Sequence, residues 1–303
     1  MTKDSLYNKI EVNNKLFKIL MISIGFLSIL SIVFINYFKL DQPVFFEHYF
    51  DLRSYNEGTY HEEMPFILRY ITNVDDSRKV SRIGFPEYPD ALVQGSEDEY
   101  MSEMIWGYGS TNLSNDNYGR YSIRTVFCNI IDLPESAYYD SIITKALIGF
   151  NDGSEMLIDI GALHLYKAER GKDILEDYYG SSSSDGVSET KYNVLEDITF
   201  QSIESPLLGQ FSDQVILEIN DMDIAKATGI AFESGEQINI KSQIQSTEDI
   251  IKDYTIFGIH PKLKFSAENG RHHTERIYNI NNMYDNDYSF MNLYRYIKER
   301  QGI

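Results

Sequence analysis

The stretch Glu236-Gln-Ile-Asn-Ile-Lys-Ser-Gln-Ile-Gln245 alternates apolar and polar residues with a period of two. Ile238, Ile240 and Ile244 fall on one face of an extended chain, and polar side chains fall on the other face. Successive side chains of a β-strand point to opposite sides of the sheet, so this pattern is typical of a strand with one buried and one solvated face. It predicts a layered β-protein.

Similar runs lie on either side of this strand. Residues 214–220 and 262–265 alternate in the same way, whereas residues 66–71 and 121–131 are apolar on both faces and suit central strands. The chain also holds 23 Tyr and 17 Phe, which are residues that strands favour. The only cysteine, Cys128, lies in one of the apolar runs and is expected to be a buried small hydrophobe.

Turns rich in glycine separate several of these runs. They are Asn151-Asp152-Gly153, Glu233-Ser234-Gly235 and Glu268-Asn269-Gly270. Glycine accepts the positive φ that tight hairpins need, so each turn predicts a β-hairpin. We therefore expect a mostly β protein with two β-sandwich domains of jelly-roll or immunoglobulin-like type.

One stretch stands out as a boundary. Residues 169–190 contain the run Gly180-Ser-Ser-Ser-Ser-Asp-Gly186 and predict a linker or long loop. The division gives one sandwich over 43–168 and another over 191–303, with a single larger sandwich as the alternative. Residues 86–120 favour extended loops, and residues 290–301 a short helix.

An apolar segment precedes the β region. Residues 19–38 carry no charge, and 13 of the 20 are Ile, Leu, Val or Phe. A helix of this length spans about 30 Å, the thickness of a bilayer hydrocarbon core. Those 13 residues favour insertion by roughly −4 to −8 kcal/mol. No small-residue cleavage site follows the segment, so we expect a single-pass transmembrane signal-anchor rather than a cleaved signal peptide.

The flanking charges predict an orientation. Four lysines precede the segment, at positions 3, 9, 15 and 18, whereas Lys39 and Arg53 are the only basic residues in a similar stretch after it. The positive-inside bias then places residues 1–18 in the cytoplasm as a short tail. The region from residue 40 onward is expected outside the plasma membrane.

The charge balance bears on partners. The chain carries 46 acidic and 27 basic residues, a net charge of −19. Residues 1–39 hold five Lys, one Asp and one Glu, so they carry +3 and the remainder −22. So negative a surface repels nucleic-acid phosphates, which makes nucleic acid a poor partner. The bilayer around residues 19–38 and a protein or envelope-glycan partner are the expected contacts.

The residue spacings of known catalytic motifs are not met in this sequence. His61-Glu62 would need a second His at position 65, which is Pro. His272 and His273 are neighbours, and a strand would point them to opposite faces. His164 lies within an apolar run and is expected to be a hydrogen-bonded strand residue. No catalytic residue is predicted, although a pair of carboxylates on different strands stays possible.

Two weaker binding hypotheses remain. Trp106 and Tyr108, which lie beside Gly107 and Gly109 in a loop, are candidates for binding a sugar or a protein. The D-x-D pairs could offer oxygen ligands to a structural Ca²⁺, though neither completes an EF-hand loop. Those pairs are Asp221 with Asp223 and Asp285 with Asp287. No other metal or cofactor is expected.

The favoured function is a membrane-anchored, extracellular binding or assembly module without enzymatic activity. One alternative is an exported hydrolase that uses carboxylates on cell-envelope glycan. Another is an accessory subunit of a membrane complex. The sequence shows no motif that would identify a protein family.

Overall fold

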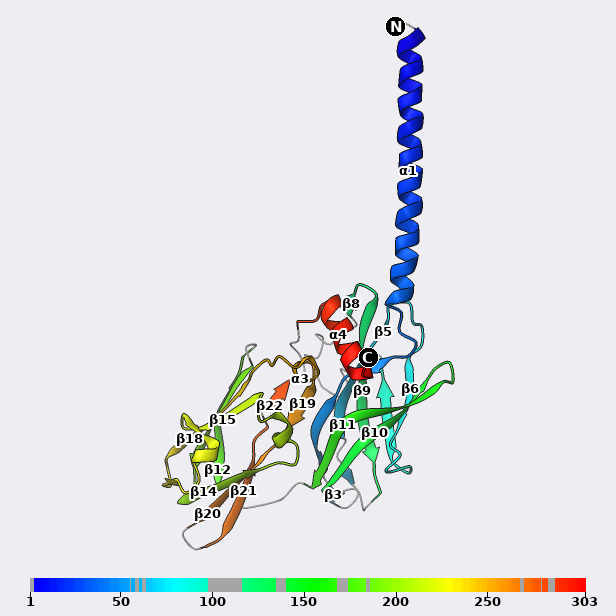
Figure 1. Ribbon diagram of the computed structural model, residues 1–303. Coiled ribbons are helices and arrows are strands. Elements are labelled where there is room, and N and C mark those ends of the chain that lie inside the picture. Colours follow the sequence, from blue (N-terminus) through cyan, green and yellow to red (C-terminus); the bar gives the residue numbers. More distant parts are fainter. Residues whose placement is uncertain are drawn as a thin grey trace.

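The structure is a computed structural model. It describes residues 3–303 apart from 55, 58–59, 62–63, 98–115, 135–139, 168–173, 184–185, 268–269, 279 and 283–286. Side chains are described from residue 14 onward, those of residues 56–57 and 60–61 excepted. The β-rich fold is confirmed: one long apolar helix leads into two β-sandwiches (Figure 1).

Helix α1 covers Lys3–Tyr37 and projects as a rod from one end of the first sandwich (Figure 1). Within the described residues it holds the one helical segment that is long and apolar enough to cross a membrane, Asn14–Tyr37, and that segment is not buried against the protein. Ser28, Ser31 and Asn36 donate to backbone carbonyls four residues earlier, at 2.9, 2.9 and 2.8 Å. Their polar groups are thereby satisfied without a partner helix.

The first sandwich packs a five-stranded sheet on a six-stranded sheet. The first has the order β1 (Val44–Phe45), β5 (Met64–Asn73), β9 (Tyr121–Asp132), β7 (Leu92–Ser96), with β8 (Asp116–Tyr118) also on β9. The second has the order β22 (Ile280–Asn282), β19 (Ile256–Ile259), β2 (His48–Ser54), β11 (Glu155–Lys167), β10 (Ser141–Phe150), β6 (Val80–Gly84). β5 and β9 are buried along most of their length, as predicted for central strands, and Cys128 is fully buried.

The second sandwich has a separate core. Its five-stranded sheet has the order β12 (Leu175–Ser182), β13 (Val187–Val194), β18 (Gln237–Ile244), β15 (Val215–Ile219), β16 (Met222–Asp223). Its four-stranded sheet has the order β17 (Ala231–Phe232), β14 (Ile198–Glu204), β20 (Lys262–Ala267), β21 (His272–Arg276). Ile238 and Ile240 of β18 are fully buried, as the alternation predicts. Short elements are β3 (Asn56–Glu57), β4 (Tyr60–His61), α3 (Ile250–Asp253) and the 3₁₀ turns η2 (Leu208–Phe211) and η3 (Ile224–Lys226).

The two cores do not coincide with the ranges 43–168 and 191–303. Strand β19 comes from the second range but pairs in parallel with β2 of the first. Its Ile256 lies in the first core, whereas Phe257 and Ile259 lie in the second. A short apolar run carries no mark of which sheet it joins, so sequence could not assign it. That either range folds alone stays a prediction.

The Gly/Ser stretch also differs from expectation. Leu175–Ser182 forms the edge strand β12, paired with β13, rather than a linker or loop. Of the predicted hairpins, the turn at Gly153 joins the paired strands β10 and β11, and the turn at Gly270 joins β20 and β21. The turn at Gly235 instead carries the chain between sheets, because β17 pairs with β14 and β18 with β13 and β15.

The C-terminal helix α4 covers Phe290–Gln301, the predicted range. The Ser289 hydroxyl accepts a hydrogen bond from the backbone N–H of Asn292, and Gly302 ends the helix with a φ of 70°. Leu293, Tyr296 and Ile297 bury this helix in the first core. The C-terminal segment therefore closes the sandwich that the N-terminal strands begin.

Candidate functional site

The structure describes only some of the predicted site residues. Trp106, Tyr108 and Asp285 lie outside the described residues. Asp223 caps η3, where its Oδ1 accepts from Ala225 N at 3.0 Å. Among the described residues, no group of three or more His, Cys, Asp and Glu is placed to hold a metal ion. The aromatic and calcium hypotheses stay predictions.

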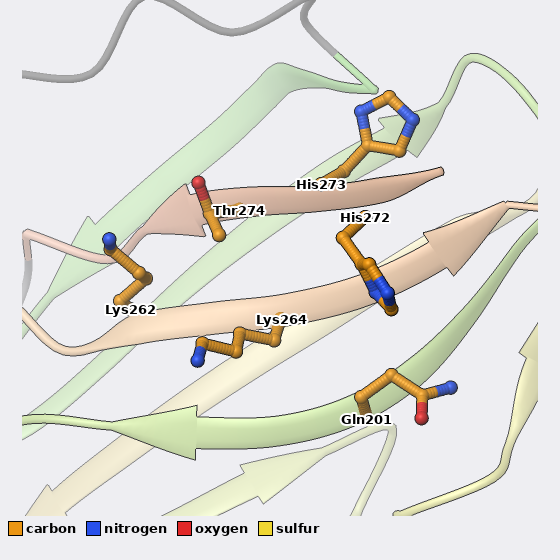
Figure 2. Close-up of a pocket in the computed structure, with 6 residues that line it drawn as sticks. All are labelled: Gln201, Lys262, Lys264, His272, His273 and Thr274. Atoms are coloured by element: carbon orange, nitrogen blue, oxygen red, sulfur yellow. The ribbon is translucent and has the colours of Figure 1, made fainter. Parts of the chain in front are cut away.

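A depression of about 520 Å³ lies on the face of β14, β20 and β21 (Figure 2). Six residues line it: Gln201, Lys262, Lys264, His272, His273 and Thr274. Two of the six, Lys262 and Lys264, are cationic.

Strand alternation explains why the lysines gather there. Leu263 and Phe265 of β20 are fully buried, so Lys262 and Lys264 project to the opposite, outer face. The register pairs Lys264 with Thr274 of β21. The lysines could have been placed from sequence, because the alternation at 262–265 already assigns them to the wet face.

Further polar groups complete this face. Gln201 lies at a register shift between Phe200 and Ser202, and its amide donates to Ser266 Oγ at 2.8 Å. Lys264 Nζ lies 2.5 Å from Glu204 Oε1, an exposed pair that contributes little to stability. His272 and His273 point in different directions (Figure 2), and His273 Nε2 lies 3.0 Å from Glu196 Oε1.

A second cluster is buried where the sandwiches meet. His164 of β11 lies opposite Asp51 of β2, with Nδ1 2.5 Å from Asp51 Oδ1. Its Nε2 lies 2.6 Å from Oδ1 of the exposed Asp140. Asp51 Oδ2 accepts from the backbone N–H of His260 at 2.6 Å, which ties β2 to the end of β19. The cluster therefore joins three strands of one sheet.

The carboxylates set the protonation of His164. Burial by itself lowers the pKa of His164, but hydrogen bonds and charge from Asp51 and Asp140 outweigh burial and raise the pKa. Both ring nitrogens can donate only when the imidazole is doubly protonated. Nearby, burial lowers the pKa of His260 to about 4. The expectation of a hydrogen-bonded strand histidine at 164 agrees with these contacts.

This geometry does not suit hydrolysis. The two carboxylates of a glycosidase need a substrate bond between them. Here the ring of His164 fills the space between Asp51 and Asp140. The cluster acts as a structural clamp.

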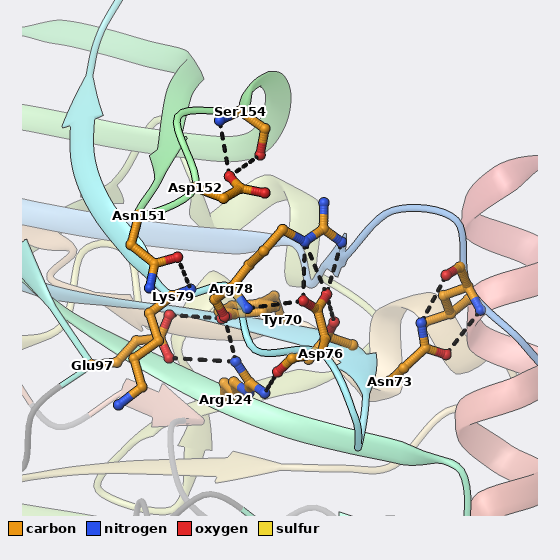
Figure 3. Close-up of polar contacts among 12 residues, drawn as sticks. Tyr70, Asn73, Asp76, Arg78, Lys79, Glu97, Arg124, Asn151, Asp152 and Ser154 are labelled. Atoms are coloured by element: carbon orange, nitrogen blue, oxygen red, sulfur yellow. Dashed lines mark hydrogen bonds and ion pairs between the residues drawn. The ribbon is translucent and has the colours of Figure 1, made fainter.

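Another polar network secures the end of the first sandwich near α1 (Figure 3). Arg124 donates to the carbonyl of Arg78 at 2.6 Å and also to that of Asp76. The hydrogen bond from Arg78 lowers the pKa of Asp76. Tyr70 donates to Glu97 at 2.7 Å. These contacts hold the loop between β5 and β6 against β9.

The exit of the chain from α1 is fixed as well. Leu40 N donates to Asn73 Oδ1 at 3.0 Å, and Asn73 Nδ2 donates to Leu40 O at 2.7 Å (Figure 3). Leu40 and Asn73 are both buried. The first residues after the helix are therefore bound to β5 instead of forming a free tether.

Comparisons with known proteins give no family. No family model matches the chain, and no curated protein matches it. Among solved structures, the D00-D0 domain of intimin is similar at a TM-score of 0.21 and 8% identity, over 78% of this chain and 98% of that chain. The human desmocollin-1 ectodomain has a TM-score of 0.19 and 8% identity, over 78% of this chain and 57% of that chain.

An α-L-rhamnosidase from Dictyoglumus thermophilum has a TM-score of 0.19 and 8% identity, over 74% of this chain and 27% of that chain. These TM-scores are too low to support an argument about function. The functional argument therefore depends on the residues of this chain.

Proposed function

We propose that the protein is a membrane-anchored binding module that presents the outer face of β14, β20 and β21 to an acidic glycan of the cell envelope. Residues 19–38 form the transmembrane anchor, and the sandwiches lie outside the plasma membrane. The observation that supports this proposal is the depression of Figure 2, which is lined by two lysines on a protein of net charge −19.

The chemistry of the face supports an anionic ligand. The ammonium group of Lys262 supplies charge, and a ligand carboxylate could also take the place of Glu204 beside Lys264. Arg276 pairs with Lys262 in register. Its guanidinium, however, lies 3.7 Å from the centre of the Tyr166 ring and donates to the carbonyl of His260 at 2.7 Å, so it is not counted in the ligand face. Beyond it, Tyr278 is 52% exposed and offers an aromatic surface for a sugar ring. Charge and stacking together favour an acidic sugar polymer over a simple anion.

The test uses the full chain in nanodiscs of neutral lipid and immobilised polygalacturonate, with a neutral glucan beside it. The double variant Lys262→Glu with Lys264→Glu should bind the uronate polymer about tenfold less tightly, since two exposed charges are reversed. Lys226→Glu with Lys241→Glu is the matched control, because it changes net charge equally on other elements. Equal loss in both variants, or no binding by the unchanged protein, would refute the proposal.

The two alternatives have their own tests. A hydrolase would release reducing ends from envelope glycan, and alanine at one carboxylate would stop the release. An accessory subunit of a membrane complex would lose function when residues 19–38 are replaced by an unrelated anchor. A binding module would tolerate that replacement.

A further inference from the structure

The first turn of α4 contacts the last turn of α1 through aromatic side chains. The ring of Phe290 lies 5.6 Å from that of Phe34 and 5.0 Å from that of Phe38. The ring of Tyr294 lies 4.9 Å from Phe38, and its hydroxyl donates to that of Tyr37 at 3.3 Å. An aromatic block thus joins the two ends of the chain.

The anchor sets the depth of this block. A hydrocarbon core of about 30 Å takes up about 20 residues at ~1.5 Å each, which residues 19–38 supply. Phe34 lies four residues before the end of that segment, so it lies about 6 Å inside the hydrocarbon boundary. If residues 19–38 span that core, Phe290, whose ring lies 5.6 Å from that of Phe34, is placed near the same boundary.

The exposed face of α4 changes character with distance from α1. Met291, Arg295 and Glu299 are all exposed and follow one another at intervals of one turn. Met291, beside the aromatic block, is 56% exposed. At the far end of the helix, Arg300 donates to the carboxylate of Glu47 at 2.9 Å and so faces the protein. Along these three exposed positions the order is apolar, cationic and anionic, and the last turn also carries the basic residues Lys298 and Arg300.

This order matches the layers of a bilayer surface. Acyl chains come first, lipid phosphates next and water last, and tyrosines favour the boundary between them. Tyr37 and Tyr294 place their hydroxyls side by side at that level. Single exposed methionines are common on soluble helices, so the position of Met291 beside the aromatic block, and not its exposure alone, supports the match.

We propose that the first turn of α4 is a second membrane contact, with Met291 at the acyl-chain boundary and Arg295 beside lipid phosphates. The contact rests on the membrane anchor of the proposed function. It makes the bilayer surface a partner of the folded region, and it fixes the tilt of the sandwiches on the membrane.

Depth-dependent fluorescence quenching tests this contact. The single tryptophan is replaced (Trp106→Phe), and one tryptophan is introduced in the full chain at Met291, at Phe26 within the anchor, or at the exposed Tyr178 of β12. Each variant is placed in phosphatidylcholine vesicles whose acyl chains carry bromine either near the headgroup or near the bilayer centre. The quenched fraction of fluorescence is measured with each lipid.

We expect Met291→Trp to be quenched by the shallow bromine and to emit at shorter wavelength than Tyr178→Trp. Phe26→Trp should be quenched by the deep bromine. If Phe26→Trp is quenched but Met291→Trp behaves like Tyr178→Trp, the second contact is refuted while the anchor stands. If Phe26→Trp is not quenched by either lipid, the anchor is refuted and the second contact with it.

Discussion

Replacing His164 by leucine should destabilise the protein by about 3–5 kcal/mol, the cost of leaving one member of a buried ion pair alone. The side chain of Asp51 is 0% exposed, and after the change it keeps only the hydrogen bond from His260 N. Asp140 adds little to the cost, because its side chain is 85% exposed and gains solvation when released.

The measurement is urea unfolding of the full chain in detergent micelles, followed by circular dichroism. His272→Leu is the control, because that histidine is exposed and should change stability by no more than about 0.5 kcal/mol. The double variant Asp51→Leu with His164→Leu should cost less than the two single changes together, by about 1–3 kcal/mol. A cost below about 1 kcal/mol for His164→Leu, or strict additivity, would refute the clamp.

Three further changes test other parts of the structure. Asp140→Asn should lower the pKa of His164, which NMR would record as a lower titration midpoint; an unchanged midpoint would contradict this. The unchanged protein should be more stable than the variant below about pH 6.5, and this difference should disappear as the pH rises through the folded-state pKa of His164. Gly161→Ala should lower the free energy of unfolding by on the order of 1–3 kcal/mol, because Gly161 has a φ of +87° and an added Cβ would lie 2.5 Å from a backbone oxygen. Gly84→Ala is the control, since an added Cβ there meets nothing within 4 Å; equal melting temperatures of the two variants would refute the argument. Phe290→Ala should cost about 1–3 kcal/mol and speed hydrogen exchange across α4, since three ring contacts are lost; unchanged exchange would show that the block does not hold the helix.

Local structure was predictable wherever one segment carries its own signal. The alternation around Ile240 and Lys264 placed β18 and β20 and assigned their faces. Residues 290–301 emerged as a helix, and Ser289 and Gly302 bound it with a cap at each end. The turn at Gly153 correctly joined two paired strands. Each of these signals lies within a few residues of the element it predicts.

The features that could not be predicted are contacts between segments that are distant in sequence. Asp51 and His164 are 113 residues apart, and parallel strands need no turn that would reveal their pairing. For the same reason β19 could not be assigned to its sheet. The turn at Gly235 has the local chemistry of a hairpin, yet the flanking strands find better partners elsewhere. The lysine-bearing face forms only because β14 and β21 pair with β20, and the alternation of residues within β20 does not reveal those pairings.

The parallel pairing of β2 with β19 has a mechanical consequence. Helix α1, the proposed anchor, precedes β2 with only the short β1 between them, and the chain leaves β19 directly into β20, the strand that carries Lys262 and Lys264. A ligand held on that face would pull β19 at its C-terminal end while the membrane holds β2 at its N-terminal end. The strands are then loaded in shear, so their hydrogen bonds resist together instead of opening one at a time. In the proposed arrangement, the junction between the sandwiches would therefore bear the tension between membrane and ligand.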